Sequence, residues 1–290
     1  MRRFTPEHHG GSGAPLVCLH GFTDTWRTWE LVLPALERRH EVLAPTMAGH
    51  LGGPPLRVAD DEGLLEAVQD TMDAAGMPVA HLVGSSLGGY LALRLAARGR
   101  ALSVVALAPA GGLPAGDAAA RRRAMRRLRL THDLVRSAAP LASEIIGSRS
   151  GRRRVTEMFA VNFEHIPAEL LEHLMVGAAG CEAAEPLIER WGRAGWELEA
   201  ERIECPVRIV WGVEDRVLPW PNAAERYRTE WLPDADWVLL DGVGHSPQLD
   251  VPDVTARLIL KLTCDRIGSA GRDRPADPEA HLRPNRIGWT

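Results

Sequence analysis

The stretch HLVGSSLGGY, at positions 81–90, places two neighbouring serines between glycines, directly after an apolar run. A serine that attacks a carbonyl group is held on a very sharp turn from strand to helix, which requires small residues two positions before and after it. Ser86 has glycine at both positions, whereas Ser85 would have Val83 and Leu87 there. We therefore predict Ser86 as a nucleophile; the alternative is a glycine-rich turn without chemistry.

A serine hydroxyl needs a neighbouring base that accepts its proton. His245, in the segment LDGVGHSPQLD, follows a predicted strand and is flanked by Gly244 and Ser246. The other histidines fall in predicted N-terminal, lid, strand or tail segments or, for His40 and His50, in loops with no evident chemical role. We predict His245 as the base; the alternative is a histidine on a surface loop.

The base in turn needs an acid that orients its ring. The segment WGVEDRVLP places Glu214 and Asp215 just beyond another predicted strand. We predict Asp215 as the acid, because Leu218–Pro219 would fix the loop and aim this carboxylate toward the sheet edge; Glu214 is the substitute. Asp241 and Asp250 are closer to His245 in sequence, but we interpret Asp250 as the start of the next helix.

The negative oxygen that develops during acyl transfer needs hydrogen-bond donors that are already in place. One is expected to be the backbone N–H of Leu87, the residue after the nucleophile, at the start of a helix. The second is expected from the loop HGF, which follows an earlier predicted strand, with the Phe22 N–H as the candidate. The alternative for this loop is a tight turn alone.

These residues need a scaffold, and the sequence predicts an α/β fold with a mostly parallel sheet covered by helices on both faces. Short apolar runs that end at Gly, Pro or Ser are typical of buried strands; they lie at 15–21, 41–46, 80–85, 102–110, 206–213 and 236–243. Segments with helical periodicity lie between them, at 25–39, 60–75 and 87–98. Alternating strands and helices favour a parallel sheet.

The alternation stops between residues 112 and 202, which we interpret as a helical cap, or lid, inserted into the core. Its first half, 118–154, has eleven arginines against two acids, a net charge of about +9. Its second half, 155–201, has ten glutamates against two arginines, about −8. The predicted units are thus 1–111 (core, first part), 112–202 (cap), 203–264 (core, second part) and 265–290 (a polar, mobile tail).

The composition is that of an ordinary globular protein, with 45% hydrophobic and 25% charged residues among 290. The formal net charge of −4 gives no reason to expect nucleic acid or an anionic membrane as the main partner. Four scattered cysteines lack metal-site spacing and fit a reducing compartment. The N-terminal segment has no apolar region of a secretory signal, and no apolar run approaches the ~20 residues of a membrane span. We therefore expect a cytoplasmic protein without metal or organic cofactor.

In combination, the motifs LHGFT, GSSLGG, GVEDRVLP and GVGHSPQ, in this order, resemble those of the α/β-hydrolase superfamily. The resemblance is to the serine-nucleophile branch with a His-Gly oxyanion loop and a helical cap, which is carboxylesterase-like, and it covers about residues 15–262. It implies a triad of Ser86, Asp215 and His245. One departure is the turn PTMAGHLGGP, with Thr46 where relatives carry Asp and Leu51 where they carry Ser; it puts the substrate assignment in doubt.

The resemblance implies a serine hydrolase that cleaves a carboxylic ester, thioester or lactone of a small molecule through an acyl-enzyme. The first alternative is a carbon–carbon bond hydrolase, or a biosynthetic lyase or cyclase, that uses the same triad. The second is a non-catalytic ligand binder on the same fold. The arginines of the cap could attract an acyl-carrier protein or an acidic substrate, but the favoured interpretation is that they face water or pair with the acidic half of the cap. Trp191 and Trp196 either line an acyl pocket or belong to the core.

Overall fold

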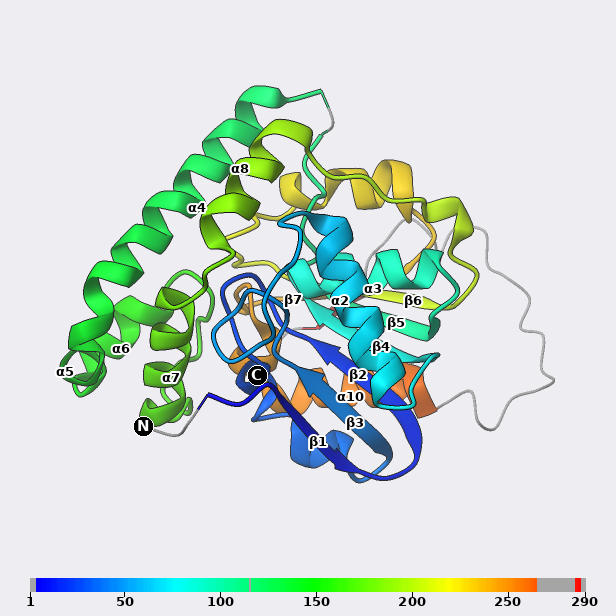
Figure 1. The fold of residues 1–290 in the computed structure, drawn as a ribbon, viewed down its shortest axis with the longest axis horizontal. Helices are drawn as coiled ribbons and strands as arrows, with labels where there is room; N and C mark the ends of the chain where they lie inside the picture. Colours follow the sequence, from blue (N-terminus) through cyan, green and yellow to red (C-terminus); the bar gives the residue numbers. More distant parts are fainter. Residues whose placement is uncertain (1–3, 115, 265–284, 288–290) are drawn as a thin grey trace.

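The computed structural model describes residues 4–114, 116–264 and 285–287, and its centre is an eight-stranded sheet (Figure 1). The strands follow the spatial order β1-β3-β2-β4-β5-β6-β7-β8. Their bounds are β1 Glu7–Gly11, β2 Ala14–Leu19, β3 His40–Pro45, β4 Ala80–Ser85, β5 Ala101–Leu107, β6 Val207–Gly212, β7 Asp236–Leu240 and β8 Asn285–Ile287. Strand β1 pairs antiparallel with β3, and the other pairings are parallel.

Helices connect these strands and cover the sheet. The α-helices are α1 Leu33–Leu36, α2 Asp61–Ala74, α3 Leu87–Ala97, α4 Ala118–Ala138, α5 Ala142–Ile146, α6 Arg149–Thr156, α7 Ala168–Ala179, α8 Ala184–Ala194, α9 Pro247–Asp250 and α10 Pro252–Cys264. Single turns of other helix types are η1 Trp26–Trp29, η2 Ala139–Leu141, η3 Ala200–Arg202, η4 Asn222–Ala224 and η5 Tyr227–Trp231.

Alternate side chains of each central strand enter two apolar layers, as the period of a strand requires. In β4, Leu82 packs with the layer of α2 and α3, whereas Val83 packs with the layer of η1, α1 and α10. Burial of a leucine or valine side chain stabilises the fold by roughly 1.5–3 kcal/mol. Both faces of the sheet are therefore covered, and the predicted α/β architecture is confirmed.

The region 25–39 is not the continuous helix that its periodicity predicts. It forms the 3₁₀ turn η1 and the single turn α1, in which Pro34 occupies one of the first two positions. Proline has no N–H to donate and disfavours helical backbone in the preceding residue, so a helix can begin at Pro34 but not run through it. Trp29 and Leu36 are nevertheless fully buried.

Two edge strands were not predicted from the sequence. Strand β1 is the polar segment EHHGG, and β8 pairs in parallel with β7. The segment 265–290, predicted as a mobile tail, contains β8, whose residues Asn285–Ile287 extend the sheet. The rest of that predicted tail lies outside the described residues.

Between β5 and β6 the chain forms helices α4 to α8, drawn in green to yellow-green on the left of Figure 1. The long helix α4 packs against α7 and α8. Its face toward them contains the buried His132 and the partly buried Met125 and Leu128. The boundaries predicted for the cap, at residues 112 and 202, remain a prediction. None of the helices in the described part of the chain combines the length and apolar content that crossing a bilayer requires.

Candidate active site

Ser86 lies at the sharp turn between β4 and α3. Its backbone has φ 54° and ψ −114°, a combination that L-residues adopt only under strain. The neighbouring glycines are required by close backbone contacts: a Cβ on Gly84 would lie 2.1 Å from the Gly88 carbonyl oxygen, and a Cβ on Gly88 would lie 2.1 Å from the Leu19 carbonyl oxygen. This geometry is the one that the spacing of the glycines predicts for a nucleophile at position 86.

The two adjacent serines have different surroundings. Ser85 is 1% exposed, and its Oγ accepts a hydrogen bond from Gln248 Nε2 at 3.3 Å. Ser86 is partly exposed, although every other residue from Ala80 to Leu93 is buried. Of the two hydroxyls, the one at Ser86 is therefore accessible to a substrate.

Asp215 and His245, predicted as acid and base, are in direct contact. His245 Nδ1 donates a hydrogen bond to Asp215 Oδ2 at 2.7 Å, and both residues are buried. The other oxygen of Asp215 accepts hydrogen bonds from the backbone N–H groups of Val217 at 2.8 Å and Leu218 at 2.7 Å. Because Nδ1 carries the proton in this arrangement, Nε2 has a free lone pair with which to accept one. Glu214, the substitute acid, is exposed.

Close packing of backbones holds the acid and base loops together. A Cβ on Gly212, at the end of β6, would lie 2.1 Å from the carbonyl oxygen of Gly244. The backbone N–H of Glu214 donates to Val243 O at 3.0 Å. The loops that carry Asp215 and His245 are therefore fixed against each other at the carboxyl ends of β6 and β7.

Asp250 is a residue whose role the sequence did not reveal. It ends α9, is 1% exposed, and does not begin a helix as we predicted. Its oxygens accept hydrogen bonds from the backbone N–H groups of Gly244 at 2.6 Å, Val161 at 2.9 Å and Asn162 at 2.6 Å, and from Asn162 Nδ2 at 2.8 Å. One buried carboxylate therefore joins the His245 loop to a cap segment some eighty residues away in sequence.

The HGF loop lies beside the nucleophile. A Cβ on Gly21 would be in van der Waals contact with Ser86 Cβ, at 3.5 Å. His20 Nδ1 donates to Gly21 O at 2.7 Å, while its Nε2 accepts the Met47 N–H at 2.8 Å. The imidazole of His20 thus fixes the conformation of the loop that carries Phe22, a predicted oxyanion donor, directly after Gly21.

Leu87, the other predicted donor, is the first residue of α3. The first N–H groups of a helix have no acceptor within the helix, so they can bind an anion. This N–H and the HGF loop both lie next to Ser86, at the carboxyl ends of β4 and β2.

The buried surroundings of the HGF loop favour the uncharged forms of His20 and Asp24. Burial lowers the pKa of His20 well below its ordinary value, and the neighbouring His50 lowers it further. Loss of water raises the pKa of Asp24 to about 7, although a hydrogen bond from the Thr25 N–H opposes the shift. His50, interpreted from the sequence as a loop residue without a role, places its ring 4.8 Å from that of His20. Stabilisation of an anion at this loop is therefore left to backbone N–H groups.

The turn at 46–54, where the sequence departs from the family pattern, connects the HGF loop to the cap. Met47 donates to His20, as described, and Gly49 O accepts the Ala183 N–H at 3.0 Å. Thr46, where the resemblance led us to expect an aspartate, donates to Thr5 O at 3.3 Å. This residue is therefore directed toward the N-terminal segment that precedes β1.

Trp191 of α8 packs behind the HGF loop. Its ring lies 5.0 Å from Phe22 and stacks on Trp196 at 4.8 Å. At 1% exposed, Trp191 belongs to the core, whereas Trp196 is partly exposed. The indole N–H of Trp191 donates to Asp61 Oδ1 at 2.6 Å. Asp61, in the first turn of α2, therefore fixes the position of the Trp191 ring that packs against the HGF loop.

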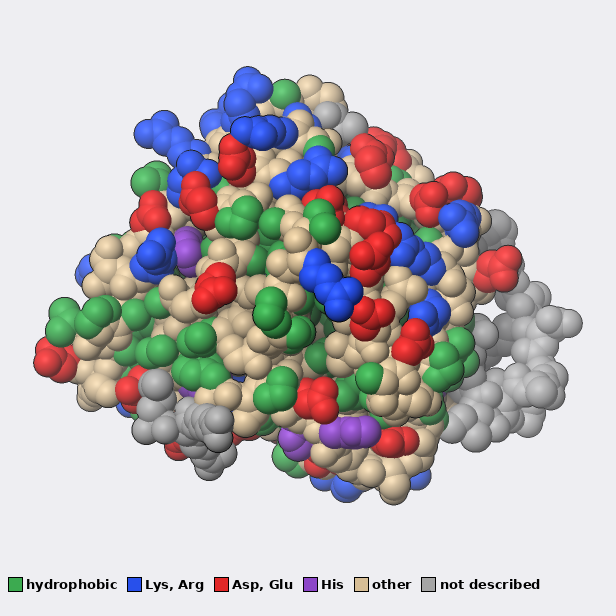
Figure 2. All heavy atoms as spheres, in the orientation of Figure 1, with side chains coloured by type: hydrophobic (Ala, Val, Ile, Leu, Met, Phe, Trp, Pro, Cys, Tyr) green, Lys and Arg blue, Asp and Glu red, His purple; other side chains and the backbone are tan. Residues whose placement is uncertain are grey.

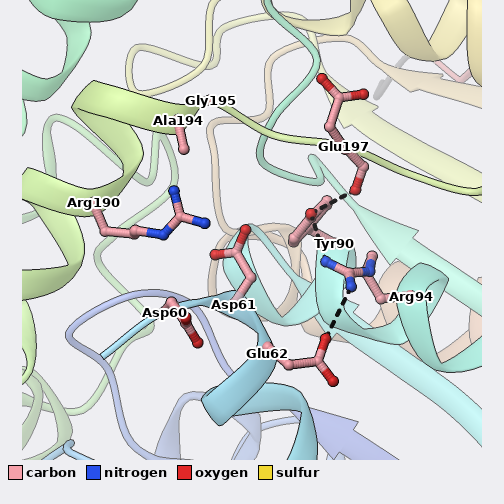
Figure 3. Close-up of a pocket in the computed structure, with 9 residues that line it drawn as sticks. All are labelled: Asp60, Asp61, Glu62, Tyr90, Arg94, Arg190, Ala194, Gly195 and Glu197. Carbon is pink, nitrogen blue, oxygen red and sulfur yellow. Dashed lines mark hydrogen bonds and ion pairs between the residues drawn. The ribbon is translucent and has the colours of Figure 1, made fainter. Parts of the chain in front are cut away.

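Asp61 also borders a polar cavity of about 230 Å³ between α2, α3 and α8 (Figure 3). In that view Arg190 extends toward Asp61, while Arg94 forms an ion pair with Glu62. Burial raises the pKa of Asp61. The lining contains none of Ser86, Asp215 and His245; it consists of Asp60, Asp61, Glu62, Tyr90, Arg94, Arg190, Ala194, Gly195 and Glu197. This cavity is therefore distinct from the candidate active site.

Among the residues that the structure describes, no three His, Cys, Asp or Glu side chains gather as they would to hold a metal ion. The site thus offers a partly exposed hydroxyl at Ser86 and a base, His245, whose ring is oriented by the carboxylate of Asp215, and groups of these types can support nucleophilic catalysis.

Comparison with known proteins gives four informative similarities. Residues 16–258 match the profile of a family described as the alpha/beta hydrolase family. The chain is 32% identical over 203 residues to the epoxide hydrolase EphH of Mycobacterium tuberculosis, and the aligned region covers 68% of this chain and 91% of that protein. Among solved structures, a bacterial membrane phospholipase A superposes with a TM-score of 0.69 and 25% identity, covering 91% of this chain and 83% of that one. The meta-cleavage product hydrolase CumD of Pseudomonas fluorescens has a TM-score of 0.65 and 22% identity, with 90% and 94% coverage, which shows a shared fold.

Proposed function

The chain belongs to the alpha/beta hydrolase family and is a hydrolase, and from that premise we propose that it cleaves a carboxylic ester, thioester or lactone of a small molecule. The reaction proceeds through an acyl-enzyme on Ser86, with His245 as base and Asp215 as the acid that orients it. The observation that carries the proposal is the strained backbone of Ser86 at the strand-to-helix turn, since such strain is retained where a site uses it.

In the first step His245 Nε2 takes the proton of the Ser86 hydroxyl as its oxygen attacks the carbonyl carbon. The carbonyl oxygen becomes negative and is stabilised by the N–H groups of Phe22 and Leu87. The tetrahedral intermediate collapses, the carbon–oxygen or carbon–sulfur bond breaks, and His245 donates its proton to the leaving group. A water molecule then attacks the acyl-enzyme by the same route and regenerates Ser86.

An epoxide hydrolase activity, suggested by the name of one relative, conflicts with the chemistry of position 86. A carboxylate that opens an epoxide forms an ester, which water can hydrolyse to release the enzyme. The hydroxyl of Ser86 would form an ether instead, and an ether has no carbonyl group for water to attack. Ser86 would therefore be consumed in one turnover, which is why we propose acyl transfer.

A fluorophosphonate tests the proposed nucleophile directly. Ser86 Oγ would attack the phosphorus atom, fluoride would leave, and intact-mass measurement would show one covalent adduct. The Ser86→Ala variant serves as the reference and should show none, whereas Ser85→Ala, which changes the neighbouring buried hydroxyl, should be labelled. Labelling of the Ser86→Ala variant, or an unlabelled and folded wild-type protein, would contradict the assignment.

A panel of small esters, thioesters and lactones then tests the reaction class. Turnover of at least one of them by the wild type, lost in Ser86→Ala, is expected. A protein that is labelled by the fluorophosphonate but cleaves none of these substrates would instead favour the carbon–carbon bond hydrolase that uses the same triad.

A further inference from the structure

Helix α4 of the cap has an outward face on which three arginines are followed by two leucines. Arg123, Arg126, Arg127, Leu130 and Leu134 follow the helical spacing that places side chains on one side. With Thr131 they line a shallow groove on the surface. The opposite side of α4 packs against α7 and α8, so this outward face, which we call the α4 face, is separate from the core.

The leucines of this face are unusually exposed. Leu130 is 58% and Leu134 is 69% exposed, and Leu141, in the turn η2 that continues the helix, is 51% exposed. Single exposed leucines are common on protein surfaces, but several along one helix face indicate a surface that meets a partner.

The charge of the helix is strongly positive. Its twenty-one residues include seven arginines and one acidic residue, Asp133, a net charge of about +6. Arg129 pairs with Glu185, but for Arg122, Arg123 and Arg126 the described part of the chain provides no carboxylate within ion-pair distance. Figure 2 shows Lys and Arg side chains gathered along the upper left of the molecule, where α4 lies in Figure 1.

Unpaired arginines beside exposed leucines on a helix match a surface that is anionic outside and apolar beneath. Arginine can bind lipid phosphates through its head group while its methylene groups lie along apolar surface. A leucine one turn beyond such arginines can enter the boundary between head groups and acyl chains. We propose that the α4 face docks the protein peripherally on an anionic lipid bilayer.

This proposal differs from the expectation drawn from the sequence, where the net charge of −4 gave no reason for an anionic membrane. A net charge sums over the whole chain, whereas binding at a surface depends on charges within about a Debye length, about 10 Å at 0.1 M salt. The positive charge of α4 is concentrated on one helix, so it can attract an anionic surface there although the net charge of the whole chain is negative.

Vesicle co-sedimentation tests the proposal without a substrate, so its outcome is independent of the proposed enzymatic activity. The full chain is mixed with phosphatidylcholine vesicles that either contain or lack phosphatidylglycerol. We expect binding to the anionic vesicles alone, and loss of binding at about 0.5 M salt, where exposed charges are screened.

Two variants test the two components of the face. Arg126→Glu with Arg127→Glu should weaken partitioning by about 25-fold or more, because each basic residue near an anionic surface contributes about fivefold. Leu130→Ser with Leu134→Ser should weaken it by about tenfold or more, through loss of apolar burial. The matched control is Arg38→Glu with Arg39→Glu, an equal charge change at exposed positions after α1, which should bind like the wild type.

Thermal unfolding of all variants checks that each is folded. Equal binding to neutral and anionic vesicles, no binding to either, or unchanged binding of the α4 variants would each overturn the proposal. Sedimentation velocity completes the test: a dimer that the leucine substitutions abolish would identify a second copy of the chain as the occupant of the α4 face, and would also overturn it.

Discussion

Replacing Asp250 by asparagine tests whether this carboxylate maintains the active site. Each of its two oxygens accepts two hydrogen bonds from N–H donors, and the residue is 1% exposed. An asparagine keeps one oxygen but turns an NH₂ group toward two of the same donors. Two charge-assisted hydrogen bonds are lost, and each contributes about 1.5–3 kcal/mol. We therefore expect the free energy of unfolding to fall by about 3 kcal/mol or more.

The loss of these two hydrogen bonds should lower both the stability and the activity of the protein. For a domain of this size about 3 kcal/mol corresponds to a decrease in Tm of roughly 6–12 °C. Gly244 precedes His245, so release of its N–H should also displace the base and lower kcat/KM on an ester. Displacement of a catalytic group by about 1 Å can cost about 100-fold.

Urea unfolding and ester kinetics are measured for Asp250→Asn and for Asp253→Asn, which makes the same chemical change at an exposed position of α10. The control should remain within about 0.5 kcal/mol of the wild type. If Asp250→Asn unfolds like the control, the four hydrogen bonds do not stabilise the fold. If it is destabilised but fully active at a temperature where it is folded, Asp250 does not position His245.

Three further outcomes follow from the structure. Asp215→Asn should lower kcat by about 10⁴ because it favours the wrong histidine tautomer, while Glu214→Gln should remain within a few-fold; the reverse order in ester kinetics would reassign the acid. Gly88→Ala should prevent folding into soluble protein, because its Cβ would lie 2.1 Å from a backbone carbonyl; a soluble variant with wild-type Tm would contradict this steric account. Burial lowers the pKa of His50 and His81 to about 4, so between pH 6.5 and 4 the unfolded chain binds more protons and stability falls as the pH drops. His50→Gln should remove up to about 3 kcal/mol of that loss, and urea unfolding of both proteins at pH 7.5 and about 4 would refute this if their pH slopes were equal.

The central strands and the nucleophile turn could be predicted because their causes are local. A strand buried on both faces requires a continuous apolar run, which makes β2 and β4 visible in the sequence. The turn at Ser86 requires small residues at fixed spacing, because the backbones on either side of it touch. The contact between Asp215 and His245 could be anticipated for a similar reason, since each follows a strand and parallel strands end at one edge.

Asp250 and β1 could not be predicted because their causes are tertiary. The local sequence around Asp250 resembles a helix start. The residues whose N–H groups bind its carboxylate, Val161 and Asn162, lie in the cap. Strand β1 has the polar sequence EHHGG and forms because the edge of β3 offers backbone partners. Only the folded chain brings these groups together, so no window of sequence contains the reason for either.

The charges of the cap show why a sum over sequence can mislead. Eleven arginines in one half and ten glutamates in the other predict mutual neutralisation. In the structure Arg129 and Arg149 pair with glutamates of the acidic half, but Glu197 pairs with Arg226 of the core and Glu199 with Arg202. Acidic residues thus turn toward the core or their own neighbours, and much of α4 keeps its positive charge. The exposed leucines beside these arginines distinguish a docking face from a solvated one, because an arginine face that only contacts water needs no apolar side chains.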